Sequence, residues 1–263
     1  MTQLLTYSFF QYAMIAVCLI ATASAIIGTY IITRRMVALA GGITHACFGG
    51  LGLGYFLGIN PVVMAGVFAV GSSLGVEWMS RRLRIREDSA TAVILSVGMA
   101  VGVLFVFLTP GYVPELNSFL FGNILTVTPA DIAVFAGFTA LLIVFVAIYY
   151  HQIVACAFDS DFAAVCGLPV RFINIVMNVM TAVCIVLTIR LVGIMLLMSM
   201  FSLPIMIAES RAHTYGRIML LSALTAIVAS VLGLFISAFV DIPCSALIVL
   251  ILAAVYIPAR IIK

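Results

Sequence analysis

Long apolar runs, separated by short polar or glycine-containing turns, make up almost the whole chain. A helix needs about 20 apolar residues to cross the hydrocarbon core of a bilayer. The pattern therefore predicts an all-α polytopic membrane protein with about eight or nine transmembrane helices. The predicted spans are residues 7–32, 36–57, 61–79, 89–108, 130–150, 172–189, 191–208, 217–240 and 244–260. A further apolar segment, 118–127, is too short to cross and is typical of a re-entrant or interfacial segment.

The composition agrees with this pattern and excludes a soluble domain. Of the 263 residues, 65% are hydrophobic and 8% are charged, and the mean hydropathy is +1.34. A domain with a wetted surface carries far more charge than this. The first ten residues lack the basic region and the small-residue cleavage site of a secretory signal, so we expect a retained first span. One transmembrane domain over residues 1–263 is the predicted unit.

The arginines lie mostly between the predicted spans and indicate the topology. If Arg34 and Arg35 are cytosolic, alternation of the spans puts nearly every other basic side chain on the same side. These are Arg81, Arg82, Arg84, Arg86, Arg171, Arg211, Arg217, Arg260 and Lys263. Arg190 is the exception. Because cytoplasmic loops of membrane proteins are enriched in basic residues, we predict an N-terminus outside and a C-terminus inside.

His45 is the first candidate functional residue, because it lies in the uncharged run Met36–Gly58. A charge at membrane depth costs about 2.5 to 3.5 kcal/mol on insertion scales, so ionisable side chains there usually face the bundle interior or a solute path. Glycines recur throughout this run. They permit either tight helix packing or a broken helix beside a substrate path, and both interpretations place His45 in the protein interior.

Other ionisable and sulfur-containing side chains are weaker candidates. Cys47 is a possible soft metal ligand, although residues two apart point to different faces of a helix. Glu209 and His213 are four apart at the end of a predicted span, so a shared helix face would give an ion pair or a ligand pair. Three further carboxylates are expected near a membrane interface, where water solvates them: Glu77, Asp131 and Asp241.

The sequence lacks the machinery of an ATPase. Its only lysine is Lys263, so no G-x-x-x-x-G-K-[ST] phosphate-binding loop exists in it. The three histidines are far apart, and no H-E-x-x-H zinc-protease motif is present. We therefore expect a chain that is not an enzyme and that holds no ATP site of its own.

The connection between the spans that end near Tyr149 and begin near Arg171 carries the sequence AFDSDFAAVCGLPV. Asp159, Ser160 or Asp161 is expected to cap a short helix there, which ends at Gly167 before a proline. A short helix in a long cytosolic loop indicates a docking surface.

Four stretches, in chain order, resemble the permease subunits of ABC importers for zinc, manganese and iron. They are RRMVALAGGITHACFGGLGLGYFLGINP, ELNSFLFGNILTVTPADI, FDSDFAAVCGLPV and VGIMLLMSMFSLP. The resemblance covers essentially the whole chain. It implies the cobalamin-permease type of helical fold, found in type II ABC importers, and a single permease domain.

The resemblance also implies partners and a location. The family assembles as a homodimer in the bacterial cytoplasmic (inner) membrane, with two cytosolic ATP-binding subunits that use the ATP and an extracytoplasmic metal-binding protein. The metal ion is cargo, and no permanently bound cofactor is implied. By the same resemblance, five residues of the cytosolic loop form the element that couples to the ATP-binding subunit: Asp159, Asp161, Phe162, Ala163 and Gly167.

In this family a G-D-x-x-x-H motif supplies an Asp and a His that coordinate the metal. The resemblance places the His at His45 and the Asp at Gly41, where this chain departs from the motif. Three explanations of the missing carboxylate stay open. Another residue supplies the ligand, the dimer brings two copies of His45 together, or the substrate is not a bare hard cation. An imidazole with sulfur nearby favours zinc or a softer ion over manganese. The expected substrate is therefore zinc first, followed by manganese or iron.

Two other functions stay open at this point. The glycine in the Asp position is compatible with a permease for a metal chelate or cofactor. An ATP-independent secondary transporter or structural subunit has the same composition and hydropathy.

Overall fold

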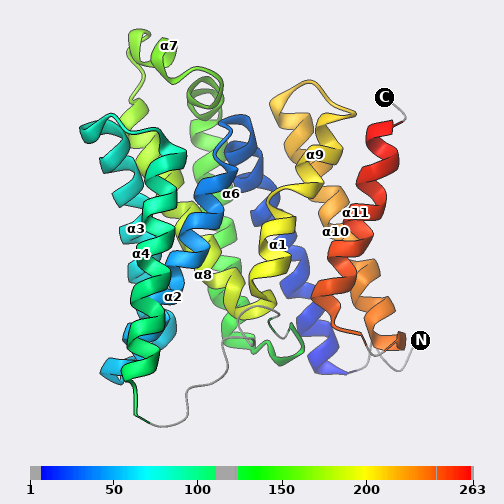
Figure 1. Ribbon diagram of the computed structural model, residues 1–263. Coiled ribbons are helices and arrows are strands. Elements are labelled where there is room, and N and C mark those ends of the chain that lie inside the picture. Colours follow the sequence, from blue (N-terminus) through cyan, green and yellow to red (C-terminus); the bar gives the residue numbers. More distant parts are fainter. Residues whose placement is uncertain (1–6, 111–121, 123, 241, 262–263) are drawn as a thin grey trace. The chain divides into compact units, whose positions relative to one another are not determined.

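The computed structural model describes residues 7–110, 122, 124–240 and 242–261, and every regular element in them is helical. The elements are α1 (Ser8–Thr33), α2 (Val37–Leu57), α3 (Pro61–Leu83), α4 (Glu87–Leu108), the 3-10 helix η2 (Ile124–Thr126), α6 (Pro129–Phe158), α7 (Ser160–Val165), α8 (Val170–Met200), α9 (Leu203–Glu209), α10 (Tyr215–Val240) and α11 (Cys244–Ile261) (Figure 1). The prediction of an all-α protein is confirmed. The short segment predicted at 118–127 lies largely outside the described residues, and its described end contains η2.

The chain folds into two compact units that alternate along the sequence. Unit 1 contains the described parts of residues 1–32, 117–154 and 188–263, and unit 2 those of 33–116 and 155–187. Helices α6 and α8 each begin in one unit and end in the other. The prediction of one transmembrane domain stays a prediction.

Eight helical segments of the described residues are long and apolar enough to cross a membrane, which agrees with the predicted eight or nine. The predicted spans 172–189 and 191–208 fall together in the 40-residue segment Val170–Glu209. The predicted boundary at Arg190 is wrong, because α8 continues through this residue and leaves helical geometry at Gly193, with φ 80° and ψ 173°.

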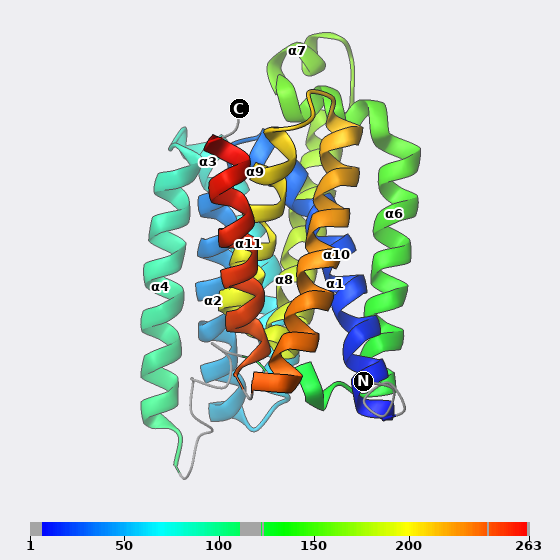
Figure 2. The ribbon, with the colours of Figure 1, turned by 90° about the vertical axis from the view of Figure 1, so that its right-hand side faces the viewer.

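The segment Val170–Glu209 is best described as two crossings. A continuous helix of that length would be about 60 Å long, twice the thickness of the hydrocarbon core. Within unit 1, the start of α1 and the end of α11 lie at opposite ends (Figures 1 and 2). Ends on opposite sides of a membrane require an odd number of crossings, and eight segments become nine crossings when the longest one is counted twice. The break at Gly193 divides that segment into two parts.

Close backbone packing holds α2 against its neighbours in unit 2. A Cβ atom at Gly50 would lie 2.4 Å from the carbonyl oxygen of Met64 on α3. A Cβ atom at Gly102 on α4 would lie 2.5 Å from the carbonyl oxygen of Phe48 on α2. Helix α2 is unbroken from Val37 to Leu57. The glycines therefore serve tight packing, and the alternative of a broken helix is wrong.

Unit 1 is held by the same kind of contact. A Cβ atom at Gly28 of α1 would lie 2.8 Å from the carbonyl oxygen of Phe201, just before α9. A Cβ atom at Gly233 of α10 would lie 2.4 Å from a side-chain carbon of Ile248 on α11. Aromatic rings add to these contacts, with Phe10 of α1 and Phe235 of α10 in an edge-to-face pair at 5.4 Å. Helices of this unit thus pack through small residues and interlocked rings.

We expect Gly102→Ala to lower the free energy of unfolding by about 1 to 3 kcal/mol, because the new methyl group meets the backbone of α2 and forces the helices apart. Thermal unfolding in detergent, followed by size-exclusion chromatography, measures the effect. Gly137→Ala is the matched control, since a Cβ atom there meets nothing within 4 Å on α6. Equal midpoints for the two variants would contradict the close contact.

Candidate functional site

His45 lies on α2 in unit 2 and is half-buried. Its Nδ1 atom is buried and has no hydrogen-bond partner among the described residues. The ring stacks on Phe48 with a centroid distance of 6.4 Å and an interplanar angle of 17°. A buried imidazole nitrogen without a partner is costly, and a bound ion or water is one explanation for such an atom. A neutral imidazole nitrogen with a free lone pair is a ligand for a transition metal.

Gly41 lies one helical turn before His45, on the same side of α2. A glycine supplies no side-chain ligand there, and no group of three or more His, Cys, Asp or Glu side chains is placed to hold a metal in the described part of the chain. Cys47 is also on α2 and is 2% exposed, but two residues along the helix it projects from a different face. His45 is thus the donor that α2 contributes from the predicted motif.

The predicted pairing of Glu209 with His213 on one helix face is wrong. Helix α9 ends at Glu209, Ser210 is its C-cap, and His213 lies in the non-helical turn that follows. The Ser210 hydroxyl donates to the carbonyl of Ile207 at 2.7 Å, and the backbone N–H of Ala212 still reaches the carbonyl of Ala208. Beyond this point the chain leaves the helix, so a spacing of four residues no longer places side chains together.

The short helix predicted in the long loop is present as α7 and is capped by Asp159. The Asp159 carboxylate accepts from the backbone N–H groups of Asp161 and Phe162, at 3.1 and 2.9 Å. At the other end Gly167 takes a left-handed φ of 78°, and the N–H of Leu168 donates to the carbonyl of Ala163 at 3.1 Å. An Asp cap and a left-handed glycine are the signals that delimit this helix.

Helix α7 exposes apolar side chains. Phe162 is 65% exposed and Val165 is 87% exposed, whereas Ala163 is fully buried beneath them. Ala163 therefore anchors the helix, and its opposite side presents an aromatic ring and a branched aliphatic side chain. An exposed aromatic side chain on a capped helix is typical of a contact with another protein.

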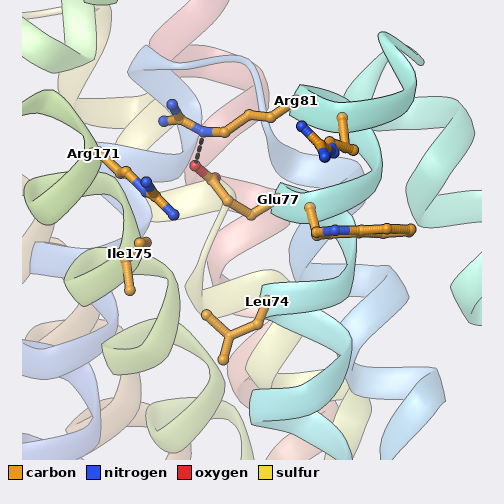
Figure 3. Close-up of a pocket in the computed structure, with 7 residues that line it drawn as sticks. Leu74, Glu77, Arg81, Arg171 and Ile175 are labelled. Carbon is orange, nitrogen blue, oxygen red and sulfur yellow. Dashed lines mark hydrogen bonds and ion pairs between the residues drawn. The ribbon is translucent and has the colours of Figure 1, made fainter.

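The surroundings of Glu77 differ from those predicted from the sequence. It is 9% exposed on α3, pairs with Arg81 one turn later, and accepts a hydrogen bond from the amide of Asn178 on α8 at 3.0 Å (Figure 3). The expectation that water solvates this carboxylate is wrong, because protein groups satisfy both of its oxygens. The spacing of four between Glu77 and Arg81 was a signal for the ion pair. No local signal could indicate Asn178, which is 101 residues away.

Asp131 and Arg190 form a second ion pair, in unit 1, at 3.0 Å. The Asp131 carboxylate also accepts from the hydroxyl of Thr128 at 2.7 Å, at the start of α6. Arg190 is the basic side chain that the predicted topology leaves outside, and its carboxylate partner lies at the same end of the unit. Asp241, the remaining carboxylate of this group, lies outside the described residues.

Residues 71–75 spell G-x-S-x-G, the letters of a hydrolase nucleophile elbow, with Ser73 as the central residue. The elbow requires a sharp turn from a strand into a helix, so that the serine is exposed. Ser73 is instead fully buried in the middle of α3. The pattern therefore carries no hydrolase chemistry in this chain.

Comparison with known proteins adds independent findings. The model of the family described as the ABC 3 transport family matches residues 6–263. A protein of Chlamydia pneumoniae named "Probable metal transport system membrane protein" is 34% identical over 249 residues, covering 92% of this chain and 85% of that protein. The manganese transport system membrane protein MntC of Halalkalibacterium halodurans is 27% identical, covering 97% of this chain and 87% of that one.

A solved structure is similar over the same length. It is PsaBC from Streptococcus pneumoniae in complex with Fab, and one of its chains matches with a TM-score of 0.84 and 27% identity. The match covers 97% of this chain and 92% of that chain. The helical arrangement described above is therefore shared along almost the whole sequence.

Proposed function

Because this chain belongs to the ABC 3 transport family, we propose that it is the membrane-spanning permease subunit of an importer for a divalent transition metal ion. Its fold is that of type II ABC importer permeases. The observation that carries the proposal within the chain is His45, whose buried Nδ1 has no partner among the described residues. That nitrogen is suited to a transient contact with a metal ion in transit.

The energy for transport comes from separate subunits in this proposal. The chain has no phosphate-binding loop, so a cytosolic ATP-binding subunit supplies the hydrolysis. Helix α7, with Phe162 exposed at its surface, is the element that we assign to that contact. Asp159, Asp161, Ala163 and Gly167 shape the helix or its ends, and they support the contact by fixing its conformation.

The proposed assembly is a homodimer in the bacterial inner membrane, with the N-terminus outside and the C-terminus inside. The positive-inside distribution of the arginines supports this orientation. An extracytoplasmic metal-binding protein delivers the ion at the outer surface. In such an assembly, a second His45 or the delivering protein can add ligands that one chain lacks.

Manganese is the first candidate for the metal, because the relative from Halalkalibacterium halodurans is named for manganese transport. Zinc is the second candidate, and the chain's own donor set favours it. His45 offers nitrogen, and Gly41 removes the carboxylate oxygen that a hard ion such as Mn²⁺ prefers. Glu209 and His213 are left out of the ligand set that we propose, because α9 ends at Glu209 and the two residues do not share a helix face.

We expect His45→Ala to reduce metal uptake by at least about 100-fold, since loss of even a supporting partner of a metal ligand costs 10- to 100-fold. Uptake of radioactive manganese and zinc into vesicles that contain the complete complex measures this. His151→Ala is the matched control, because His151 is an exposed histidine on α6. Normal uptake by the His45 variant would remove this residue from the mechanism.

The substitution Gly41→Asp is expected to shift metal preference toward manganese, because it restores a carboxylate one turn from the imidazole. The readout is the ratio of manganese-stimulated to zinc-stimulated ATP hydrolysis by the complex, which should rise several-fold over that of the natural chain. Gly137→Asp, on α6, is the control for an added charge. If a labelled metal chelate stimulates hydrolysis and free ions do not compete with it, the substrate is a chelate.

Phe162→Ala is expected to weaken co-purification of the ATP-binding subunit and to lower metal-stimulated ATP hydrolysis by roughly 10-fold, as for loss of a buried aromatic anchor. Phe239→Ala is the control, because Phe239 is similarly exposed, at 59%, near the end of α10. Uptake that persists without any ATP-binding subunit would favour a secondary transporter and overturn the ABC proposal.

A further inference from the structure

A cavity of about 380 Å³ opens between α3 and α8 within unit 2 (Figure 3). Arg81 and Arg171 reach toward the carboxylate of Glu77 from the two helices (Figure 3). Leu74 and Ile175 line the cavity further along the same helices (Figure 3). The cavity is therefore charged at one end and apolar at the other.

The charged end carries an excess of positive charge. The carboxylate of Glu77 is occupied by the guanidinium of Arg81 and the amide of Asn178. Two further arginines line the cavity, Arg82 and Arg171, and neither has an ion pair among the described residues. Both are exposed. Within the cavity lining, three guanidinium groups stand against one carboxylate, and this net charge of +2 favours an anion.

The apolar end lies deeper in the membrane-spanning part of the helices. Helix α3 ends at Leu83 and α8 begins at Val170, so the arginines lie at helix ends. Leu74 precedes Arg81 by seven residues, which is about 10 Å along the helix axis. On α8 the apolar Ile175 likewise lies one turn inward from Arg171. Both helices thus change from cationic to apolar in the same direction.

Trp78 lies between these two ends of the cavity lining and is 59% exposed. Tryptophan concentrates at the level of lipid headgroups, where its ring contacts the acyl boundary and its N–H meets water. A small soluble anion makes no favourable contact with the apolar half of the cavity. A molecule with a phosphate at one end and hydrocarbon at the other matches both halves.

We propose that this cavity binds an anionic phospholipid at the membrane surface. The phosphate lies between Arg82 and Arg171, and the first part of an acyl chain lies along Leu74 and Ile175. Arg81 is held in place by Glu77, so the carboxylate positions the cationic wall without neutralising the other two arginines. The inference concerns the membrane contact of unit 2 and is independent of which metal is carried.

The test titrates the purified full-length chain, with or without an ATP-binding subunit, with phosphatidylglycerol or phosphatidylcholine and counts bound lipids by native mass spectrometry. We expect tighter binding of phosphatidylglycerol. The double variant Arg82→Ala/Arg171→Ala should weaken that binding by about 25-fold, because each basic side chain near an anionic headgroup contributes roughly fivefold. Binding of phosphatidylcholine should not change.

The control is Arg211→Ala/Arg217→Ala, which removes two exposed arginines from unit 1 and should leave phosphatidylglycerol binding unchanged. An excess of inorganic phosphate should fail to displace the lipid; displacement would mean a site for the free anion and would overturn the proposal. Unchanged lipid binding by the cavity variant would also overturn it. So would a loss of the ATP-binding subunit without loss of lipid, which would make the cavity a protein contact.

Discussion

Inside a bilayer no water can satisfy a polar group, so every polar atom at membrane depth has to find its partner within the protein. Several buried hydroxyls meet this requirement by donating back to their own helix. Thr29 donates to the carbonyl of Ala25 and Thr44 to that of Ala40, each at 2.7 Å. Ionised groups meet it through partners on other turns or helices, as Glu77 does with Arg81 and Asn178. Four buried side-chain atoms of the described residues lack such a partner, and the Nδ1 of His45 is the one among them that is an imidazole nitrogen, able to bind a transition metal.

The same constraint explains how much of the fold was predictable. Hydropathy identifies spans because an α-helix satisfies its backbone within one segment in lipid, so the long apolar runs became helices as expected. The break at Gly193 was misplaced by three residues, because Arg190 looked like the end of a span. In the structure Arg190 has a carboxylate partner in Asp131, which allows the helix to continue through a charged residue.

The candidate site was predictable where its signals are local. Asp159 and Gly167 delimit α7 as the sequence indicated, because caps depend on residues a few positions apart. The bond between Glu77 and Asn178 was not predictable, because it joins segments far apart in the sequence. The supposed pair Glu209 and His213 failed for a different reason: the helix ended between them, and helix ends are the least certain part of a sequence-based prediction.

Helix α7 is covalently placed between the end of α6 and the start of α8, the two helices that each pass from one compact unit into the other. A displacement of α7 is therefore transmitted along α6 and α8, and each of these helices has residues in both units. Helical geometry is interrupted in each of these two helices within unit 1, at Tyr149 in α6 and at Gly193 in α8. Bending costs least where the hydrogen-bond ladder is already interrupted. If a partner protein displaces the six-residue helix α7, we expect α6 and α8 to bend at Tyr149 and Gly193 rather than along their whole length.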